Sequence, residues 1–336
     1  MKKILILTII IPLIGWSQEN FTFFHNGIER DYILYAPDNL KDEAPLVFVM
    51  HGYGGNSQEM MNSCEMNSLA DNEGFMICYP EGTIDNYGNH FWNVGYNFHQ
   101  NVTVDDVDFI VDLANFLQEN YSLNSALTFA TGMSNGGELC YLLACEASVT
   151  FRAVASVAGG MWYNYLNQNP CQPKMPIPVF IKHGTNDNVT YYEGDVNDNY
   201  WGPYLSVDSV LSIHISNLML DNVAIDTLEN INNNQRVTIR YKYSSEENFK
   251  EVWLYKYLNG GHSWNSDDYS IEEEIWGFFM QMSEQDTDPL TIKENYINKE
   301  LIHMIDVLGK ESKKIKSQLL FYIYDDGSVE KRVILE

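Results

Sequence analysis

The chain alternates between short, continuous apolar runs and longer stretches in which apolar residues recur at helical spacing. A continuous apolar run is typical of a strand that is buried on both faces of a parallel sheet. Residues 107–117 instead show the 3.6-residue period of an amphipathic helix. Buried strands that alternate with such helices predict a doubly wound α/β fold with a mostly parallel sheet. The apolar runs are Pro45–Met50, Phe75–Tyr79, Ala126–Ala130, Ala153–Val157 and Pro178–Ile181.

Weaker patterns flank this repeat. Phe21–His25 and Tyr32–Tyr35 predict two strands, and the Asn26-Gly27 pair between them is a hairpin signal. The polar, turn-rich segment 283–289 predicts that the main domain covers residues 18–284 and that a linker follows over 285–299. The elements expected before that linker are a helix at 205–220, strands at 237–243 and 252–257, and a closing helix at 271–282.

Residues 300–336 have the character of a small all-β appendage. Apolar stretches precede and follow an Asp326-Gly327 pair, which is a strong hairpin signal. The segment resembles the C-terminal sorting domains that Bacteroidetes proteins carry for type IX secretion, above all in Ile305–Gly309 and Tyr324–Lys331. The resemblance implies that the secretion machinery is a partner. The alternative is a structural β-cap on the main domain.

The N-terminus has the pattern of a secretory signal peptide. The basic start Met1–Lys3 precedes the apolar run Ile4–Ile14, and Gly15, Trp16 and Ser17 follow it. An apolar run this short cannot span a bilayer, which requires about 20 residues. No later segment is apolar enough to do so. We therefore expect a signal peptide over residues 1–17, no membrane span, and a secreted or cell-surface protein.

The net charge disfavours two classes of partner. The net charge is −26, because 46 acidic residues outnumber 20 basic ones, and this charge repels nucleic acid and anionic membranes.

In an oxidising compartment disulfides persist, and an odd number of cysteines leaves at least one unpaired. No two cysteines have the C-x-x-C spacing of a zinc or redox site. The five are Cys64, Cys78, Cys140, Cys145 and Cys171.

The segment Gly132–Gly136 fits the pattern G-x-S-x-G. It lies where the apolar run Ala126–Ala130 ends and a helical stretch, Gly137–Ala144, begins. A strand that turns sharply into a helix exposes the central serine, and flanking glycines avoid clashes in that turn. The sequence therefore predicts that Ser134 is a nucleophile.

A serine hydroxyl needs a base to take its proton, and the base needs an acid to orient it. His262 lies in a glycine-rich turn after the strand at 252–257, and Asp187 follows the strand at 178–181. The order serine, aspartate, histidine is the one that this kind of sheet uses. Asp195 and Asp198 are rival carboxylates. The histidines that fit the base less well are His25, His90, His99, His214 and His303.

The developing oxyanion requires two backbone N–H donors, one from the residue after the nucleophile and one from the loop after an early strand. Asn135 supplies the first. Tyr53, in the loop that follows Pro45–Met50, supplies the second, with its neighbour Gly54 as the alternative. In this loop His51 fits a bracing role better than a reactive one.

Aromatic residues near these loops are candidates for substrate binding. Trp92 and Tyr96 belong to an aromatic segment, 87–98, and Trp264 lies two residues after His262. Flat aromatic faces suit phenolic acyl groups and sugar rings. Packing within the loop is an equally good interpretation of the segment.

Two acidic segments suggest metal binding at first sight. Asp195–Asn199 begins like a calcium loop, but Tyr200 stands where that loop needs glycine and Ser206 where it needs glutamate. The carboxylates at 105, 106 and 108 fit a helix N-terminus, where the macrodipole favours negative charge. We expect no metal and no cofactor.

Eight motifs in the same order resemble the polyhydroxybutyrate depolymerase and feruloyl esterase family of α/β-hydrolases, and the resemblance spans about residues 22–283. It implies a metal-independent, secreted carboxylic ester hydrolase whose triad falls on Ser134, Asp187 and His262. It also implies a disulfide between Cys145 and Cys171. The motifs are His51–Gly55, Tyr79–Gly82, Trp92-Asn93, Asp105–Val107, Gly132–Gly137, Leu143–Glu146, His183–Asp187 and Gly260–Trp264.

These observations predict a serine esterase that works through an acyl-enzyme. We favour feruloyl or acetyl esters on polysaccharides as substrates, because no separate polymer-binding domain is visible. Oligomers or polymers of hydroxybutyrate are the alternative polyester substrate, and a serine peptidase is a third option. A catalytically silent hydrolase fold that serves as a binding module is the alternative from a different class.

Overall fold

The computed structural model describes residues 19–228, 236–266, 269–284, 301–306, 319–324 and 329–333. The chain divides into two compact units, Met1–Gln285 and Asp286–Glu336. The expected signal peptide at 1–17 and the expected linker at 285–299 lie outside the described residues.

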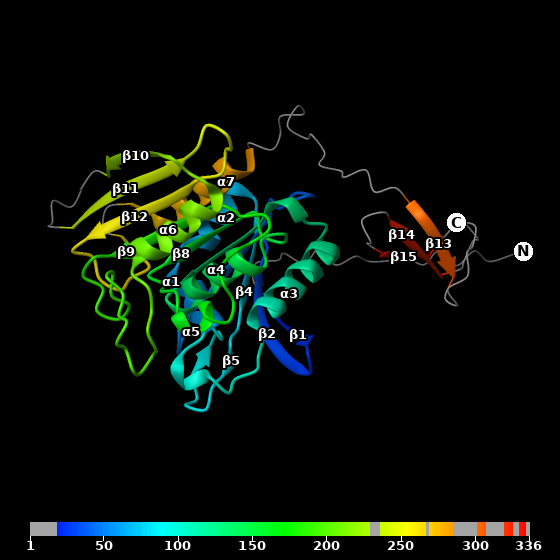
Figure 1. Ribbon diagram of the computed structural model, residues 1–336, viewed down its shortest axis with the longest axis horizontal. Coiled ribbons are helices and arrows are strands. Elements are labelled where there is room, and N and C mark those ends of the chain that lie inside the picture. Colours follow the sequence, from blue (N-terminus) through cyan, green and yellow to red (C-terminus); the bar gives the residue numbers. More distant parts are fainter. Residues whose placement is uncertain are drawn as a thin grey trace, which may run out of the picture. The chain divides into compact units, whose positions relative to one another are not determined.

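A ten-stranded sheet forms the centre of the first unit (Figure 1). The six strands β4, β3, β7, β8, β9 and β12 are parallel, and antiparallel pairs flank them on both sides. The strand order is β1-β2-β4-β3-β7-β8-β9-β12-β11-β10. The bounds are β1 Glu19–His25, β2 Ile28–Tyr35, β3 Leu46–Met50, β4 Met76–Pro80, β7 Thr128–Met133, β8 Ala153–Val157, β9 Val179–Gly184, β10 Asn222–Thr227, β11 Val237–Ser244 and β12 Val252–Leu258.

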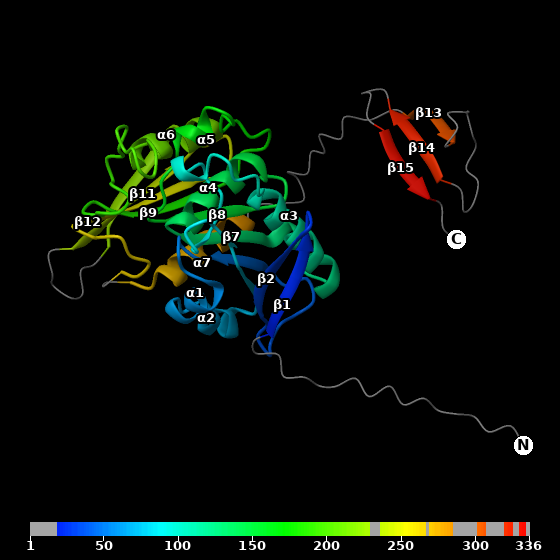
Figure 2. The same cartoon turned by 90° about the horizontal axis from the view of Figure 1, so that it is seen from below.

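Helices cover both faces of this sheet, so the predicted doubly wound α/β fold is confirmed (Figure 2). One face packs against α3, α4 and α6, and the other packs against α1, α2 and α7. The helices are α1 Ser57–Ser63, α2 Met66–Glu73, α3 Asp106–Tyr121, α4 Asn135–Glu146, α5 Tyr163–Leu166, α6 Val207–Leu218 and α7 Ile271–Glu284, and two short 3₁₀ helices are η1 Asn97–His99 and η2 Ser125–Leu127.

Strand β3 shows why the apolar runs form the middle of the sheet. Its residues alternate between the two cores: Leu46 and Phe48 pack on one face, and Val47 and Val49 on the other. All of them are fully buried. A strand covered on both faces must be apolar at every position, which is the pattern seen in the sequence.

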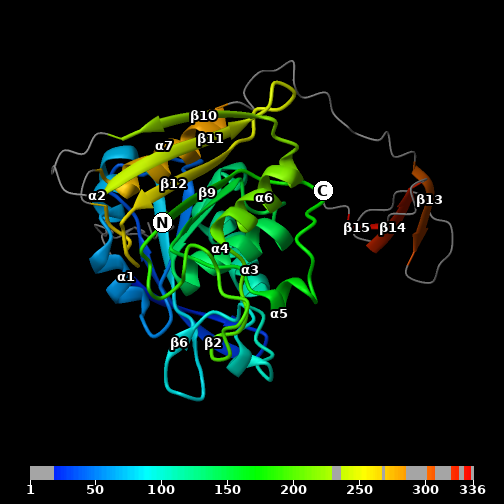
Figure 3. The same ribbon diagram turned by 60° about the vertical axis from the view of Figure 1, so that its left-hand side comes forward.

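Several elements differ from the sequence prediction. The run predicted as a strand at 126–130 begins as the 3₁₀ turn η2, and the strand itself starts at Thr128 and continues to Met133. Strand β10 was not predicted, because its apolar run is only three residues long and every one of its residues is exposed at the edge of the sheet (Figure 3). A two-stranded hairpin, β5 Thr83–Ile84 with β6 His90–Phe91, was also missed because two residues carry no periodicity.

The second unit contains a three-stranded antiparallel sheet in the order β13-β14-β15. Its strands are β13 Leu301–Asp306, β14 Leu319–Tyr324 and β15 Val329–Val333. The expected Asp326-Gly327 turn lies outside the described residues. Within the described part of the chain, no helix is both long enough and apolar enough to cross a membrane.

Candidate active site

Ser134 occupies the sharp turn between β7 and α4. Its φ of 53° and ψ of −121° lie outside the ordinary regions for a residue with a side chain. The turn is held at both ends, because the Ser134 N–H donates to the carbonyl of Val157 at 2.8 Å and the Ser134 carbonyl accepts from the N–H of Glu138 at 2.8 Å. A strained residue that its neighbours fix in place is characteristic of a functional turn.

The two flanking glycines are required by close approach of the backbone. A Cβ on Gly132 would lie 2.5 Å from the carbonyl carbon of Gly136. A Cβ on Gly136 would lie 2.6 Å from the carbonyl oxygen of His51. Because neither contact is sterically possible, the strand, the helix and the loop after β3 can meet at Ser134 only with glycine at both positions.

His262 and Asp187 come together at the carboxyl ends of two adjacent strands. Strands β9 and β12 are parallel and in register, so the loops that follow them start side by side. The Nδ1–H of His262 donates to Oδ2 of Asp187 at 2.8 Å. The other carboxylate oxygen of Asp187 accepts the N–H groups of Val189 and Thr190, each at 2.9 Å.

These bonds keep Asp187 ionised. Burial raises the pKa of its carboxyl, but the hydrogen bond from His262, the charge of that ring and the backbone N–H bond outweigh burial, and the net pKa is below the ordinary value. The neighbouring His183 is fully buried and its Nε2–H donates to the carbonyl of Thr190. Burial lowers the pKa of His183 to about 4, although the charge of Asp187, whose Oδ2 lies 3.4 Å from Nε2 of His183, acts in the opposite direction.

Ser134 and His262 line the same cavity, which has a volume of about 280 Å³. Since Nδ1 of His262 is bonded to Asp187, Nε2 is the ring nitrogen left for the serine hydroxyl. Within the described residues the two side chains form no hydrogen bond with each other, and such bonds often close only when substrate is present. The other residues that line this cavity are Tyr53, Tyr96, Glu138, Trp162, Val189, Thr190 and Trp201.

The loop after β3 contains the expected second oxyanion donor. The N–H of Gly54, the alternative donor, is occupied because it donates to the carbonyl of His90 at 2.8 Å. His51 braces the loop: its Nε2 accepts the N–H of Gly82 at 2.9 Å, and its Nδ1–H donates to the carbonyl of Gly52 at 2.7 Å. Burial lowers the pKa of His51, although the bond to the Gly52 carbonyl opposes this shift. Because both ring nitrogens are engaged, the ring has no free nitrogen for proton transfer.

The side chain of Asn135, the first residue of α4, is bonded to the segment that follows β6. Its Oδ1 accepts the N–H of Trp92 at 2.7 Å, and its Nδ2 donates to the carbonyl of Trp92 at 3.0 Å. Nδ2 also contacts Oε2 of Glu138 at 3.3 Å, and the hydroxyl of Tyr96 donates to the same oxygen at 2.6 Å. Glu138 was missed in the sequence, although a carboxylate four residues after Ser134 on a helix must share its face.

Only one of the three aromatic residues expected to bind substrate lines the cavity. Tyr96 does so. Trp92 is completely buried, and its indole N–H donates to the carbonyl of His51 at 2.9 Å. Trp264 packs in the core on the opposite face of the sheet, and its indole N–H donates to Glu272 at 2.6 Å. The structure therefore gives Trp92 and Trp264 packing positions, because each has a buried partner for its one polar atom.

Two tryptophans that were not predicted from the sequence line the cavity instead. Trp162 follows β8, and Trp201 belongs to the loop after β9. Oδ1 of Asp198 accepts the N–H groups of Tyr200 and Trp201, so this carboxylate, a rival of Asp187 in the sequence, in fact shapes the turn that holds Trp201. No sequence pattern marks such a loop residue as part of the cavity.

The carboxylates at 105 and 106 have different structural roles at the N-terminus of α3. Asp105 caps α3 as expected, since its Oδ1 accepts the N–H of Asp108 at 2.9 Å. Asp106, however, is buried and forms an ion pair with Arg30 at 2.7 Å.

Within the described residues, His25, Asp108 and Asp112 form the one group of three ligand-type side chains close enough to hold a metal, and it does not line the cavity of Ser134.

Cys145, near the end of α4, is joined to Cys171 by a disulfide. Cys64, Cys78 and Cys140 are free and buried. Burial raises the pKa of the Cys64 thiol to about 11 and raises those of Cys78 and Cys140 well above the ordinary value. These three thiols are therefore packing residues and not nucleophiles.

Comparison with known families and sequences finds similarity to esterases. Residues 30–191 match the family described as esterase PHB depolymerase. Feruloyl esterase C of Emericella nidulans is 30% identical over 177 residues, which are 51% of this chain and 61% of that protein. A bifunctional acetylxylan esterase/xylanase of Neocallimastix patriciarum is 27% identical over 167 residues, or 50% of this chain and 23% of that protein. The chain thus spans less than two thirds of either relative.

Solved structures show the same architecture. An acetyl xylan esterase from Aspergillus awamori superposes with a TM-score of 0.59 at 15% identity, over 79% of this chain and 99% of that one. The feruloyl esterase module of Clostridium thermocellum gives 0.51 at 12% identity, over 80% of this chain and 88% of that one. At such identities the likeness concerns the fold, and the fold is that of the α/β-hydrolases.

Proposed function

We propose that this chain, whose residues 30–191 match the esterase PHB depolymerase family, is a serine carboxylic ester hydrolase. One observation carries the proposal: Ser134 stands at a strained turn in the same cavity as His262, and His262 is hydrogen-bonded through Nδ1 to the ionised Asp187. A hydroxyl, an imidazole and a carboxylate in this relation are the parts that acyl transfer requires.

In the proposed mechanism, Oγ of Ser134 attacks the ester carbonyl carbon while Nε2 of His262 takes the hydroxyl proton. Asp187 fixes the tautomer and stabilises the imidazolium that forms. The tetrahedral intermediate collapses to an acyl-enzyme, and His262 gives its proton to the departing alcohol. Water then attacks the acyl carbon while His262 takes its proton. When the acyl–Oγ bond breaks, His262 returns this proton to Oγ of Ser134, and the carboxylic acid is released.

The backbone N–H groups of Tyr53 and Asn135 serve as the oxyanion hole. The occupied N–H of Gly54 supports the choice of Tyr53. Asn135 begins α4, where the first N–H groups of a helix have no partner within the helix and carry partial positive charge. Losing one such donor costs about 3 kcal/mol in the transition state.

The proposed substrates are feruloyl esters on polysaccharides, with acetyl esters as the related alternative. Support comes from the cavity wall, in which Tyr53, Tyr96, Trp162 and Trp201 present four aromatic rings. Such walls suit a planar phenolic acyl group. Two relatives are named as feruloyl and acetylxylan esterases, and the Clostridium thermocellum module was solved in complex with sinapinate, which is also an aromatic acid.

Poly(hydroxybutyrate) or its oligomers remain the second candidate substrate, since the matching family is described by that activity. Ester-bearing polymers, in either case, are the proposed partners. Secretion through the N-terminal segment and a sorting role for residues 300–336 are separate proposals that rest on the sequence pattern alone.

The experiment compares the parent with Ser134→Ala on methyl ferulate, p-nitrophenyl acetate and a hydroxybutyrate trimer. We expect the parent to hydrolyse methyl ferulate fastest and the variant to lose at least about 10³-fold in kcat on every substrate it turns over. Ser216→Ala, an exposed serine on α6, is the matched control and should match the parent. Equal turnover by parent and Ser134→Ala rules out the serine mechanism, and a folded parent that turns over none of the esters supports a silent binding module.

A further inference from the structure

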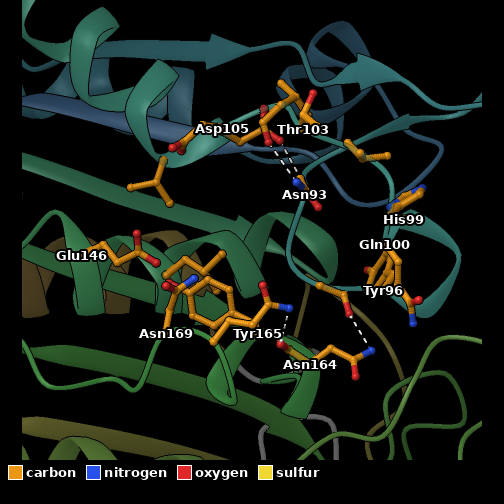
Figure 4. A pocket seen from close by; sticks show the side chains of 17 residues that line it. Asn93, Tyr96, His99, Gln100, Thr103, Asp105, Glu146, Asn164, Tyr165 and Asn169 are labelled. Carbon is orange, nitrogen blue, oxygen red and sulfur yellow. Dashed lines mark hydrogen bonds between the residues drawn. The ribbon is translucent and has the colours of Figure 1, made fainter.

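A second cavity of about 280 Å³ is lined by a different set of residues from the one that contains Ser134, and Figure 4 shows its lining. Its walls come from residues 93–107, from Leu142 and Glu146 of α4, and from residues 164–169 on and after α5. Tyr96 lines both cavities, so the two are separated by little more than one side chain. None of the groups assigned to the proposed esterase mechanism other than Tyr96 reaches this second cavity.

The cavity contains a buried hydroxyl that has no partner. Tyr165 is 9% exposed, and its Oη forms no hydrogen bond within the described residues. Nδ1 of His99, another residue of the lining, is likewise buried and unbonded, while Nε2 of the same ring is bonded to Asp85 at 3.1 Å. Buried polar atoms in native proteins nearly always have partners, so an orphaned hydroxyl in a cavity wall indicates a polar ligand.

Charge in the lining excludes an anion as that ligand. The residues that line the cavity include three carboxylates and neither lysine nor arginine. Asp106 is paired with Arg30, which leaves Asp105 and Glu146 without a cationic partner among the lining residues. Partial burial, followed by the repulsion of Asp105, raises the pKa of the Glu146 carboxyl, which agrees with two carboxylates that face one space. Such a pair accepts hydrogen bonds from a ligand's hydroxyl groups.

A metal ion does not fit this cavity. Ligand atoms around an ion must converge closely, and within the described residues the one such group is His25, Asp108 and Asp112. Asp105 and Glu146 do not belong to it. Apart from the Thr103 hydroxyl, the remaining polar side chains are carboxamides, which donate and accept equally and so match a neutral ligand that does both. They are Asn93, Gln100, Asn164, Gln168 and Asn169.

The lining is also amphipathic. Val102, Val107 and Leu142 offer an apolar wall, and the amides, carboxylates and the Tyr165 hydroxyl offer polar groups around it. A pyranose ring has the complementary shape, with C–H groups on its faces and hydroxyls around its edge. A volume of about 280 Å³ lies at the small end of ligand sites and suits one ring better than a long chain.

We propose that this cavity binds a single neutral pyranose unit of a polysaccharide. This site is not catalytic, and it goes beyond the esterase activity without depending on it. Because Tyr96 joins the two cavities, a main-chain sugar held by Tyr165 would lie next to an ester held at Ser134.

The test is calorimetric titration of the purified protein with three unesterified neutral probes, namely xylotriose, cellotriose and mannotriose. We expect at least one of them to bind, and we expect Tyr165→Phe to weaken that binding about fivefold, as for the loss of one hydrogen bond. Glu146→Gln should weaken it as well. The matched controls are Tyr163→Phe, on the same helix but outside the lining, and Glu119→Gln, exposed on α3, and both should bind like the parent.

Tyr165→Phe removes only an unbonded hydroxyl, so its melting temperature should not fall, and its turnover of p-nitrophenyl acetate should equal that of the parent. The proposal is overturned if no trisaccharide binds, if Tyr165→Phe binds as tightly as the parent, or if putrescine binds and the sugars do not. No ester is cleaved in this titration, so its result does not depend on the outcome of the Ser134→Ala test. A failed titration likewise leaves the proposed esterase activity untouched.

Discussion

The ammonium group of Lys182 donates a hydrogen bond to the main-chain carbonyl of Ser263 at 2.5 Å. It also contacts the carbonyls of Trp264 and Asn265, each at 3.2 Å. Lys182 lies on β9 and is 1% exposed, so a buried charge is satisfied by the loop that contains His262. The loop is fixed from the other side as well, because a Cβ on Gly184 would lie 2.6 Å from the carbonyl carbon of Gly260.

Lys182→Met should therefore lower kcat without a matching change in KM. Three carbonyls lose their donor, the loop relaxes, and a misplacement of the base by about 1 Å costs about 10²-fold. Steady-state kinetics on p-nitrophenyl acetate give kcat and KM separately, and Lys174→Met, an exposed lysine, is the control. If Lys182→Met does not fold, Lys182→Gln, which keeps a donor, takes its place. A folded variant with the kcat of the parent would show that the loop holds its shape without the lysine.

The sequence was sufficient for the middle of the fold. Strands buried on both faces leave continuous apolar runs, and β3, β4, β8 and β9 were located from these runs alone. Strand β10 left no such trace, because its exposed residues have no core to fill. The start of β7 was misplaced by two residues, since Asn124 caps the short turn η2 with its side chain, and a turn bond of this kind is not visible as periodicity.

The candidate site was located from sequence where a residue type suited to catalysis follows a predicted parallel strand. Ser134, Asp187 and His262 each follow the carboxyl end of a parallel strand, which is the edge where such sheets place their sites. The cavity wall was not predictable in the same way. A tryptophan looks alike in sequence whether it lines a cavity, as Trp201 does, or packs beneath it, as Trp92 does, because only tertiary contacts separate the two.

Reducing the Cys145–Cys171 disulfide should destabilise the protein. The bond closes a separation of 26 residues, which corresponds to a loss of about 3.5 kcal/mol in the free energy of unfolding when the constraint on the unfolded chain is removed. The double variant Cys145→Ala with Cys171→Ala, compared with the parent by urea unfolding, measures the effect. Cys140→Ala, a free and buried cysteine on the same helix, is the control for loss of packing alone. A double variant no less stable than this control contradicts the prediction.

Acid should destabilise the protein through His214. This histidine on α6 is buried, its Nε2 has no partner within the described residues, and burial lowers its pKa to about 4 from 6.5. Above pH 6.5 the ring is neutral in both the folded and the unfolded chain, and its titration has no effect. Below pH 6.5 the unfolded chain takes up the proton first, so stability falls until the pH reaches about 4.

At pH 5 the cost from His214 is about 2 kcal/mol, by the difference between the two pKa values. His214→Phe keeps a ring stacked on Tyr141, whose centroid lies 5.6 Å away, and removes the titration. We expect urea unfolding at pH 7 and pH 5 to show a smaller loss of stability in the variant than in the parent by that amount. Parent and variant alike should also lose stability through His183, whose pKa is lowered to about 4 by the same cause. Equal losses in parent and variant would show that His214 is protonated at no cost.

Trp201 should discriminate between aromatic and small acyl groups. Its ring lies 5.3 Å from that of Tyr53 and 4.9 Å from that of Tyr96, so three rings form one wall of the cavity of Ser134. Trp201→Ala removes the largest of them. We expect KM for methyl ferulate to rise about tenfold, because one aromatic contact with the acyl group is lost. KM for p-nitrophenyl acetate should stay within about twofold of the parent value. Phe24→Ala, which removes an exposed ring on β1, should change neither constant. Equal increases in KM for both esters would mean that Trp201 shapes the cavity as a whole and does not contact the acyl group.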